Sequence, residues 1–290
     1  MKTGLVLEGG AMRGMFTAGV LDVLMEHGIQ LDGAIGVSAG AVFGCNYKSH
    51  QIGRVIRYNT QYCNDKRYAS FKNLLRTGNL YSESFCYHTV PEKLDPFDET
   101  AFRESPMDFF VVCTDMRTGD PIYHKCRTGD AEDVRWMQAS ASMPLFAKIV
   151  RIGSYQLLDG GIADSIPVRF FESIGYQRNL IVLTQPKGFE KKKNRMLPAI
   201  RARYVRYPAF VEAVADRHQR YNETLDHIAM LEQTGKAFVI RPPIPLEIGP
   251  MERDPAQLRR VYETGRAVAE IQVDKIAAFV KESQALEPQG

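Results

Sequence analysis

Residues 36–40 read Gly-Val-Ser-Ala-Gly, a spacing that can present the hydroxyl of Ser38 as a nucleophile. An apolar run precedes the motif and a helix-compatible run follows it, which predicts a sharp strand-to-helix turn at the serine. Gly36 and Gly40 leave room for so tight a backbone. Unpaired N–H groups at the start of the helix would favour negative charge developing there. The motif also occurs in turns that merely pack, so its weight depends on groups that could assist the serine.

The glycine-rich loop Gly-Gly-Ala-Met-Arg-Gly at residues 9–14 is one such group. Its glycine N–H groups can point at a carbonyl oxygen without obstruction, which predicts an oxyanion hole. Arg13 is placed either to steady the loop or to meet an anionic head group. A dinucleotide-binding loop, with Asp32 as the ribose-binding acid, is a weaker interpretation because the central glycine is missing. A plain strand-to-helix turn is the remaining alternative.

Asp159 is the second assisting group, at the end of an apolar run and directly before Gly160 and Gly161. Burial at a strand end and nearby charges would set its basicity. Histidine is the usual partner of a serine nucleophile, but His218 and His227, which follow Asp159, lie in a charged helical pattern typical of a solvated face. The other four histidines are no better placed: His27, His50, His88 and His124. We therefore predict a Ser38–Asp159 dyad with the carboxylate as base.

The elements that must position these groups alternate between strand and helix. Strands at residues 4–8 and 31–37 are each followed by a helix, the first stopping at Gly28 and the second covering residues 39–46. This order predicts an α/β fold with a mainly parallel sheet and helices on its faces. Further strands are predicted at residues 107–114, 121–125, 148–152, 155–158, 180–184 and 237–240, with hairpin turns at 118–121 and 153–154. Further helices are predicted at residues 131–140, 168–174, 209–233 and 256–283.

Two stretches interrupt the alternation. Residues 64–99 are polar and aromatic, and an insertion there would lie over the carboxyl ends of the strands, either as a cap over the site or as a surface excursion without a role. Residues 187–206 interleave eight basic side chains with aromatic ones. Such a run is either a contact with an anionic membrane surface or a solvated connection.

Composition bounds the remaining possibilities. The 290 residues are 44% hydrophobic and 24% charged, an ordinary globular mixture, and the net charge of +3 is too small to indicate nucleic acid. No apolar run approaches the roughly 18 residues of a membrane span, and the N-terminal apolar segment is too short for a signal peptide. The five cysteines are scattered, as expected of free thiols in the cytoplasm. His124 and Cys126 have no second pair nearby, so no metal site and no cofactor are predicted.

Taken together, the glycine loop, the serine motif and the late Asp-Gly-Gly turn resemble the patatin-like phospholipase family over residues 3–185. The run Ala-Ser-Ala-Ser-Met-Pro-Leu-Phe at residues 139–146 is similar to the family's segment before its aspartate, and residues 16–22 are nearest to its bacterial branch. The resemblance implies a three-layer α/β/α fold and acyl ester hydrolysis by a Ser–Asp dyad without metal or histidine. It implies these site residues: Ser38 and Asp159 as nucleophile and base, Gly9, Gly10, Ala11, Met12, Arg13 and Gly14 around the oxyanion, and Gly36, Gly40, Gly160 and Gly161 in the turns.

Two positions depart from the family pattern. Ala11 replaces a frequent glycine, and its small side chain is tolerated if the backbone there has a negative φ. Ser165 stands where relatives often have asparagine, which alters one supporting hydrogen bond.

The expectation is a single domain over residues 1–290, with a catalytic core at 3–185, a cap at 64–99 and a helical portion at 200–290. The expected substrate is an acyl ester, most plausibly a phospholipid or lysophospholipid. Acyl transfer by the same dyad and non-catalytic binding of lipid or nucleotide are the alternatives. Chain length, head group and oligomeric state stay open.

Overall fold

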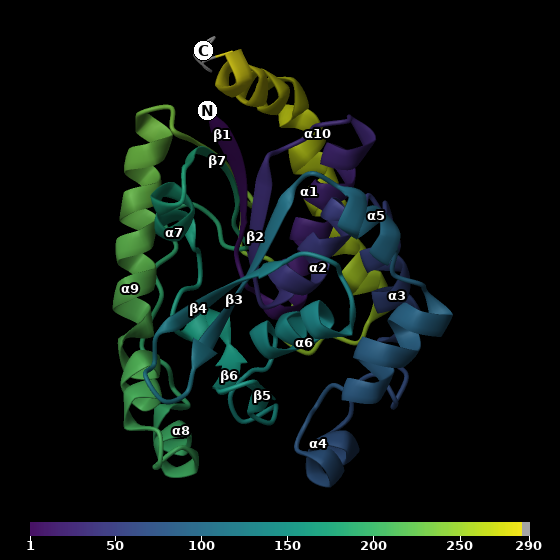
Figure 1. Cartoon of the computed structure of the whole chain (residues 1–290), viewed down its shortest axis with the longest axis vertical. Helices are drawn as coiled ribbons and strands as arrows, with labels where there is room; N and C mark the ends of the chain where they lie inside the picture. Colours follow the sequence, from purple (N-terminus) through teal and green to yellow (C-terminus); the bar gives the residue numbers. More distant parts are fainter. Residues whose placement is uncertain (286–290) are drawn as a thin grey trace.

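The computed structural model describes residues 1–285 and arranges them around a sheet of eight strands (Figure 1). Along the sheet the order is β5-β6-β3-β2-β1-β7-β8, and β4 pairs with β3. The strands are β1 (Lys2–Leu7), β2 (Gly33–Val37), β3 (Asp108–Asp115), β4 (Pro121–Cys126), β5 (Val150–Ile152), β6 (Tyr155–Asp159), β7 (Tyr176–Val182) and β8 (Ala237–Ile240).

Strands β8, β7, β1, β2 and β3 run parallel, and β4, β5 and β6 are antiparallel additions. The predicted turns at residues 118–121 and 153–154 join the β3–β4 and β5–β6 hairpins. Parallel strands need crossover helices, which lie on both faces of the sheet. The predicted α/β/α fold with a mainly parallel sheet is therefore confirmed.

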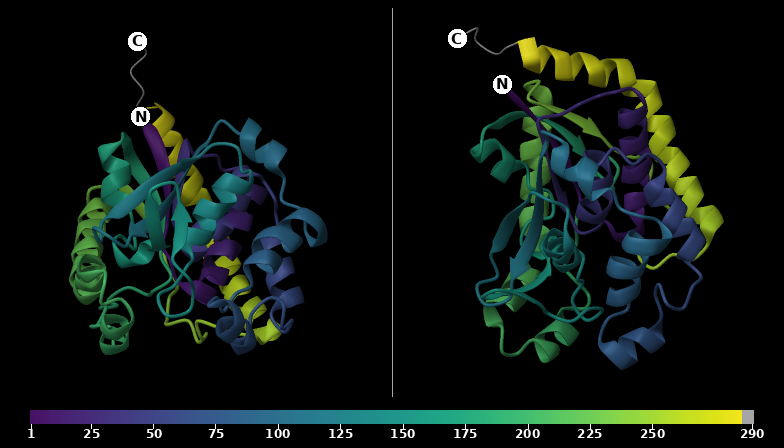
Figure 2. Two further views of the ribbon diagram at one scale, coloured as in Figure 1. Left: turned by 60° about the horizontal axis from the view of Figure 1, so that its bottom comes forward. Right: turned by 45° about the vertical axis from the view of Figure 1, so that its right-hand side comes forward.

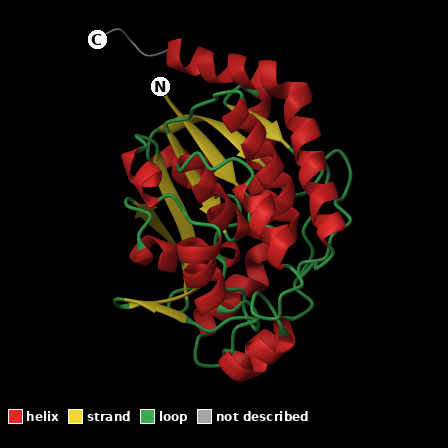
Figure 3. Ribbon diagram, turned by 90° about the vertical axis from the view of Figure 1, so that its right-hand side faces the viewer, coloured by secondary structure: helices red, strands yellow, loops and turns green. Residues whose placement is uncertain are grey.

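Alternate residues of the central strands pack into two different hydrophobic cores, one on each face of the sheet. Leu5 and Leu7 of β1 pack toward one face, and Val6 packs toward the other. The first face is covered by α1 (Gly14–Glu26), α2 (Ala39–Lys48), α3 (Arg54–Tyr62), α6 (Ala131–Ser140) and α10 (Pro255–Ala285). The second is covered by α7 (Val168–Ser173) and α9 (Pro208–Gln233). Figure 3 shows the first helical layer in front of the strands.

The last helix, α10, lies closely against the first helix, α1 (Figure 2). A Cβ atom on Gly265 would stand 2.0 Å from the carbonyl oxygen of Phe16, so the backbones touch where the glycine lies. The Tyr262 hydroxyl donates to the Asp22 carboxylate at 2.7 Å, and Arg266 pairs with Glu26. The two ends of the chain thus share one layer.

Residues 50–104 contain short helices that the sequence did not predict. They are α3, α4 (Phe71–Thr77), a π-helix η2 (Phe85–Leu94) and α5 (Glu99–Glu104), and α8 (Leu197–Arg203) was missed in the same way later in the chain. Helices of this length have weak periodicity and depend on tertiary packing. Among the predicted elements the largest boundary change is in β7, which begins at Tyr176 rather than residue 180. Within the described part of the chain, no helix has the length and apolar character needed to cross a membrane.

Candidate active site

Ser38 lies on the turn between β2 and α2, as the motif predicts. Its φ of 55° and ψ of −121° are outside the usual regions for a residue with a side chain, a strain of about 1–3 kcal/mol that the surroundings must hold in place. The backbone N–H of Ser38 donates to Ser140 Oγ at 2.9 Å, and that hydroxyl donates to the Val112 carbonyl at 2.6 Å. A Cβ atom on Gly36 would lie 2.3 Å from the Gly40 carbonyl oxygen, so the turn requires glycine there.

The register of β3 brings Asp159 to the same place. Val37, just before the serine, pairs with Val112, and Asp159 pairs with Cys113 on the other side of β3. Ser38 and Asp159 therefore lie at the same level with one strand between them. The close approach depends on Gly160, because a Cβ atom there would lie 2.0 Å from the Val112 carbonyl oxygen.

Asp159 is buried, with 6% of its surface exposed. Burial raises the pKa of its carboxyl, and this outweighs a hydrogen bond from the Ser38 side chain, the positive charge of Arg217 and the Gly161 N–H, all of which lower the pKa. The Gly161 N–H donates to Asp159 Oδ1 at 2.8 Å. A carboxylate with a raised pKa is a better proton acceptor than an exposed one.

The glycine loop meets the serine from the neighbouring strand β1. A Cβ atom on Gly9 would lie 3.1 Å from Ser38 Cβ, so only a glycine leaves the serine free there. Among the described residues, the N–H groups of Gly9 and Gly10 donate to no acceptor. Free backbone donors beside a serine can bind an oxyanion. Met12 and Arg13 continue the loop in a short 3₁₀ helix that α1 follows from Gly14.

The condition under which Ala11 would be tolerated without strain, a negative φ, is not met, because its φ is 49°. An alanine in this left-handed region is strained by roughly 1–2 kcal/mol, which a glycine would not be. Glu8, which the sequence did not single out, anchors the loop from below. It accepts the Thr184 N–H at 2.6 Å and the Tyr221 hydroxyl at 2.6 Å, and Arg13 Nε lies 3.5 Å from Thr184 Oγ1.

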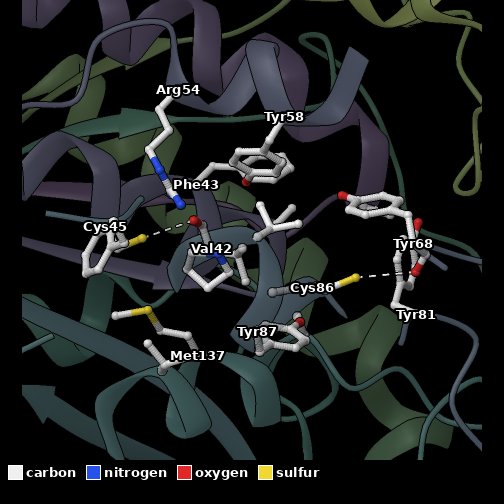
Figure 4. A pocket seen from close by; sticks show the side chains of 18 of the residues that line it. Val42, Phe43, Cys45, Arg54, Tyr58, Tyr68, Tyr81, Cys86, Tyr87 and Met137 are labelled. Carbon is white, nitrogen blue, oxygen red and sulfur yellow. Dashed lines mark hydrogen bonds between the residues drawn. The ribbon is translucent and has the colours of Figure 1, made fainter. Parts of the chain in front are cut away.

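A cavity of about 130 Å³ has Ser38 in its wall. Figure 4 shows most of the side chains that line it. Its walls are mostly aliphatic and aromatic. Seven of the lining residues come from the predicted cap, Tyr68, Tyr81, Cys86, Tyr87, Val90, Pro91 and Phe97; the others are Ala11, Met12, Ser38, Ala39, Val42, Phe43, Cys45, Arg54, Tyr58, Val134, Met137, Ala141 and Met143. The cap residues thus form one side of a mostly apolar pocket.

Arg54 is the one charged residue among those described in the cavity wall. It is 5% exposed, donates to the Asp95 carbonyl at 2.6 Å and to Asn46 Oδ1 at 2.8 Å, and lies against the rings of Tyr58 and Phe97. The Asp95 carboxylate pairs with Arg57 at 2.7 Å. This ion-pair group fastens the end of the cap to α3.

The histidines are engaged elsewhere. His218 Nδ1 lies 3.0 Å from the Ala215 carbonyl within α9, and His227 pairs with Glu172 at 2.6 Å. His27 and His88 pair with exposed glutamates. No histidine is among the described residues that line the cavity.

His124 and Cys126 are less isolated than the sequence indicated, because Asp133 of α6 joins them within 4.8 Å. The Asp133 carboxylate is already engaged: one oxygen lies 3.2 Å from His124 Nε2, and the other accepts three N–H groups from residues 127–129 at 2.8 Å. Burial raises the pKa of Asp133, but these hydrogen bonds bring it down to about 2. Burial also raises the pKa of the Cys126 thiol well above its usual value. The group orders the loop before α6.

A serine on a strained elbow thus lies beside a buried carboxylate and loop amides that have no acceptor among the described residues, within an α/β fold. Comparison with known families then places the chain: the model described as "Patatin-like phospholipase" matches residues 5–171, more than half of the sequence. The chain belongs to the patatin-like phospholipase family. A second model, "Domain of unknown function (DUF6363)", matches residues 207–281.

The relatives found among curated sequences are distant. The chain is 28% identical over 280 residues to the Escherichia coli K12 protein YjjU, covering 91% of this chain and 75% of that one. It is 28% identical to the patatin-like phospholipase domain-containing protein ZK370.4 of Caenorhabditis elegans and 26% identical to lysophospholipase NTE1 of Chaetomium globosum, covering 59% and 60% of this chain but only 13% and 11% of theirs. VipD from Legionella pneumophila is a similar solved structure, at 15% identity and a TM-score of 0.46 over 94% of this chain and 67% of that one.

Proposed function

We propose that this protein hydrolyses acyl esters of lipids, with Ser38 as nucleophile and Asp159 as base. The observation that carries the proposal is the juxtaposition of the two side chains across β3, at the mouth of an apolar cavity. Membership of the patatin-like phospholipase family supports lipid ester chemistry.

In the first half of the reaction, Ser38 Oγ attacks the ester carbonyl carbon while its proton passes to Asp159. The carbonyl oxygen becomes an oxyanion and accepts the free N–H groups of Gly9 and Gly10, with Ala11 beside them. Collapse of this intermediate breaks the bond to the alcohol, which takes the proton from Asp159. Water then attacks the acyl-enzyme by the same route and releases the acid.

The substrate class follows from the cavity. Its aliphatic and aromatic walls suit one acyl chain, and walls of this kind leave the polar part of the lipid outside. A phospholipid or lysophospholipid meets both conditions. The name of the fungal relative, a lysophospholipase, agrees with the second choice, although the match covers only 11% of that protein.

Residues 187–206 are proposed to contact the anionic surface that holds the substrate. Seven of their cationic side chains are exposed, namely Lys187, Lys192, Lys193, Arg195, Arg201, Arg203 and Arg206, together with the apolar Met196 and Val205. Cations interleaved with exposed apolar side chains bind anionic lipid surfaces in a salt-dependent way. Co-sedimentation with vesicles containing phosphatidylserine, at low and high salt, tests this contact.

The alternatives have less support. The Asp32 carboxylate, which a dinucleotide site would use for ribose, accepts the Thr3 N–H at 2.6 Å instead. Acyl transfer would use the same dyad and differs only in the acceptor. Product analysis with added alcohol or lysophospholipid separates transfer from hydrolysis.

The proposal is tested with p-nitrophenyl esters of graded chain length and with defined phospholipids. Ser38→Ala and Asp159→Asn are each expected to lower kcat/KM by roughly 10,000-fold. His218→Ala and His227→Ala serve as matched controls and should retain activity. An unchanged rate in Ser38→Ala would refute the assignment. Loss of activity in a folded histidine variant, as complete as in Asp159→Asn, would refute the histidine-free dyad.

A further inference from the structure

Helix α9 brings an arginine, Arg217, against the back of the Asp159 turn. Its Nε and Nη2 atoms each lie 3.4 Å from Ser165 Oγ. The Ser165 hydroxyl donates to the Gly161 carbonyl at 2.7 Å, and the Gly161 N–H donates to Asp159 Oδ1 at 2.8 Å. A Cβ atom on Gly161 would lie 3.1 Å from both Arg217 Nη2 and Asp159 Oδ1. The guanidinium and the carboxylate therefore both lie close to the position that a Gly161 Cβ atom would occupy.

The charge of Arg217 is not neutralised by an ion pair with any of the described residues. Among the described residues, no carboxylate lies within 4 Å of its guanidinium, and its Nε and Nη2 atoms share the Ser165 hydroxyl at long range. Burial lowers the pKa of Arg217, and Asp159 is the first of the groups that oppose this effect. Asp159 is thus the acid to which this cation is most strongly coupled.

Other charged and titratable groups surround the pair. Tyr221 and Glu8 act on Arg217 from α9 and from the end of β1, with Arg13 opposing them from the glycine loop. Lys191 lies over the Tyr221 ring at 4.2 Å, and burial together with Arg217 lowers the pKa of Lys191 to about 8. On the other side, Ser38, Cys113 and Tyr87 face Asp159. Arg220 of α9 also reaches the turn, where it donates to the Ile162 carbonyl at 3.1 Å, but Arg217 is the cation whose charge acts on the Asp159 carboxyl.

We propose that Arg217 is a positioning residue of the reaction: through Ser165 and Gly161 it holds the Asp159 turn, and its charge keeps the buried carboxylate ionised and ready to accept the Ser38 proton. The inference rests on the proposed dyad. It also gives the region matched as a domain of unknown function, residues 207–281, a defined task in the reaction. Ser165, which departs from the family pattern, is the hydroxyl through which the helix reaches the turn.

The direct test is the pH dependence of kcat/KM for a p-nitrophenyl ester. Removing the cation leaves burial of Asp159 opposed only by the Ser38 and Gly161 hydrogen bonds, so Arg217→Gln should move the acidic limb up by about one pH unit and lower activity on that limb by roughly 10-fold. Arg217→Lys keeps a positive charge, so the acidic limb of its pH profile should stay close to the wild-type position. Arg259→Gln, which removes an exposed arginine of α10, is the control for net charge and should leave the profile unchanged.

Chemical rescue separates charge from packing. Arg217 lines a second cavity of about 310 Å³, beside Ser165, Arg169 and Arg220, so Arg217→Ala leaves space that a small molecule can enter. Millimolar guanidinium should restore activity and the acidic limb, and the neutral isostere urea should not.

The proposal is overturned if Arg217→Gln is folded and keeps the wild-type pH profile, or if urea rescues as well as guanidinium. Thermal melting of each variant establishes folding, and Arg217→Lys covers the case in which the alanine variant does not fold. Failure of the dyad itself gives a different result, because Ser38→Ala would then remain active. If Ser38→Ala is inactive and Arg217→Gln keeps the wild-type pH profile, only the proposed role of Arg217 is refuted.

Discussion

Asp159 and Ser38 are both held in states that an isolated residue would avoid. The carboxylate is buried, so its pKa is raised, and the serine has a positive φ. Neighbouring groups keep both in place: Ser140 fixes the serine backbone, and the Gly161 N–H together with Arg217 opposes the effect of burial. Groups arranged in this way favour reactivity at the expense of stability.

This arrangement predicts that Asp159→Asn is more stable than the wild type near neutral pH. Because the folded pKa is raised, the folded state binds the proton more tightly than the unfolded chain, and stability falls as pH rises from the ordinary aspartate value of about 3.9 through the raised pKa. Asparagine removes this penalty, which should raise Tm by about 2–4 °C.

Thermal melts from weakly acidic to neutral pH provide the measurement. The difference in Tm should shrink as the pH falls, because the wild-type carboxyl becomes protonated in both states. A less stable Asp159→Asn at neutral pH, or a difference that grows in acid, would contradict the role assigned to burial.

At the level of elements, the segment of residues 64–99 is tied to the core through its end. Asp95 follows η2 directly, and its carboxylate serves two arginines of α3, Arg57 at 2.7 Å and Arg54 at 3.5 Å. Arg54 is at the same time part of the cavity wall. The position of the cap and the shape of the cavity therefore depend on the same ion pairs.

Asp95→Asn is expected to lower the free energy of unfolding by about 3 kcal/mol, because it leaves the buried Arg54 without its counter-charge. The same change should weaken discrimination among esters of different chain length, since the end of the cap would lose its ion pairs with Arg57 and Arg54. Urea unfolding and a chain-length profile measure the two effects. Glu83→Gln, an exposed change of equal charge in the same segment, should stay within about 0.5 kcal/mol; an equally small effect of Asp95→Asn would contradict the account.

The strands, the long helices and the serine and aspartate motifs could be predicted because each has a local signature: apolar runs, turn residues or glycine spacing. Other features depend on contacts between segments far apart in the chain. The positive φ of Ala11, the partnership of Arg217 with Ser165 and the joining of Asp133 to His124 have no local pattern. The short helices of the cap are equally invisible, since packing rather than periodicity stabilises them.

Across the whole molecule, the regions matched by the two family models are interlocked. Helix α9 supplies Tyr221 to Glu8 and Arg217 to the Asp159 turn, while α10 packs on α1 through Gly265 and Tyr262. The single domain expected over residues 1–290 stays a prediction, and these contacts across both faces of the sheet are what favour it.

Gly265→Ala is predicted to destabilise the whole molecule. Alanine normally stabilises a helix relative to glycine by about 1 kcal/mol, but here its Cβ would clash with the Phe16 carbonyl. A net loss of about 1–3 kcal/mol is expected in urea unfolding. The control is Gly249→Ala, because a Cβ atom there has no neighbour within 4 Å. A single cooperative transition with unchanged midpoint in Gly265→Ala would contradict the packing described.

The central claim, that Ser38 is a nucleophile activated by Asp159, is tested most directly by covalent labelling. Wild-type protein treated with a fluorophosphonate is digested, and mass spectrometry identifies the modified residue and its rate of modification. We expect a single adduct on Ser38 that forms rapidly in the wild type and far more slowly in folded Asp159→Asn. An adduct on another residue, or labelling of Ser38 at the same rate without Asp159, would contradict it.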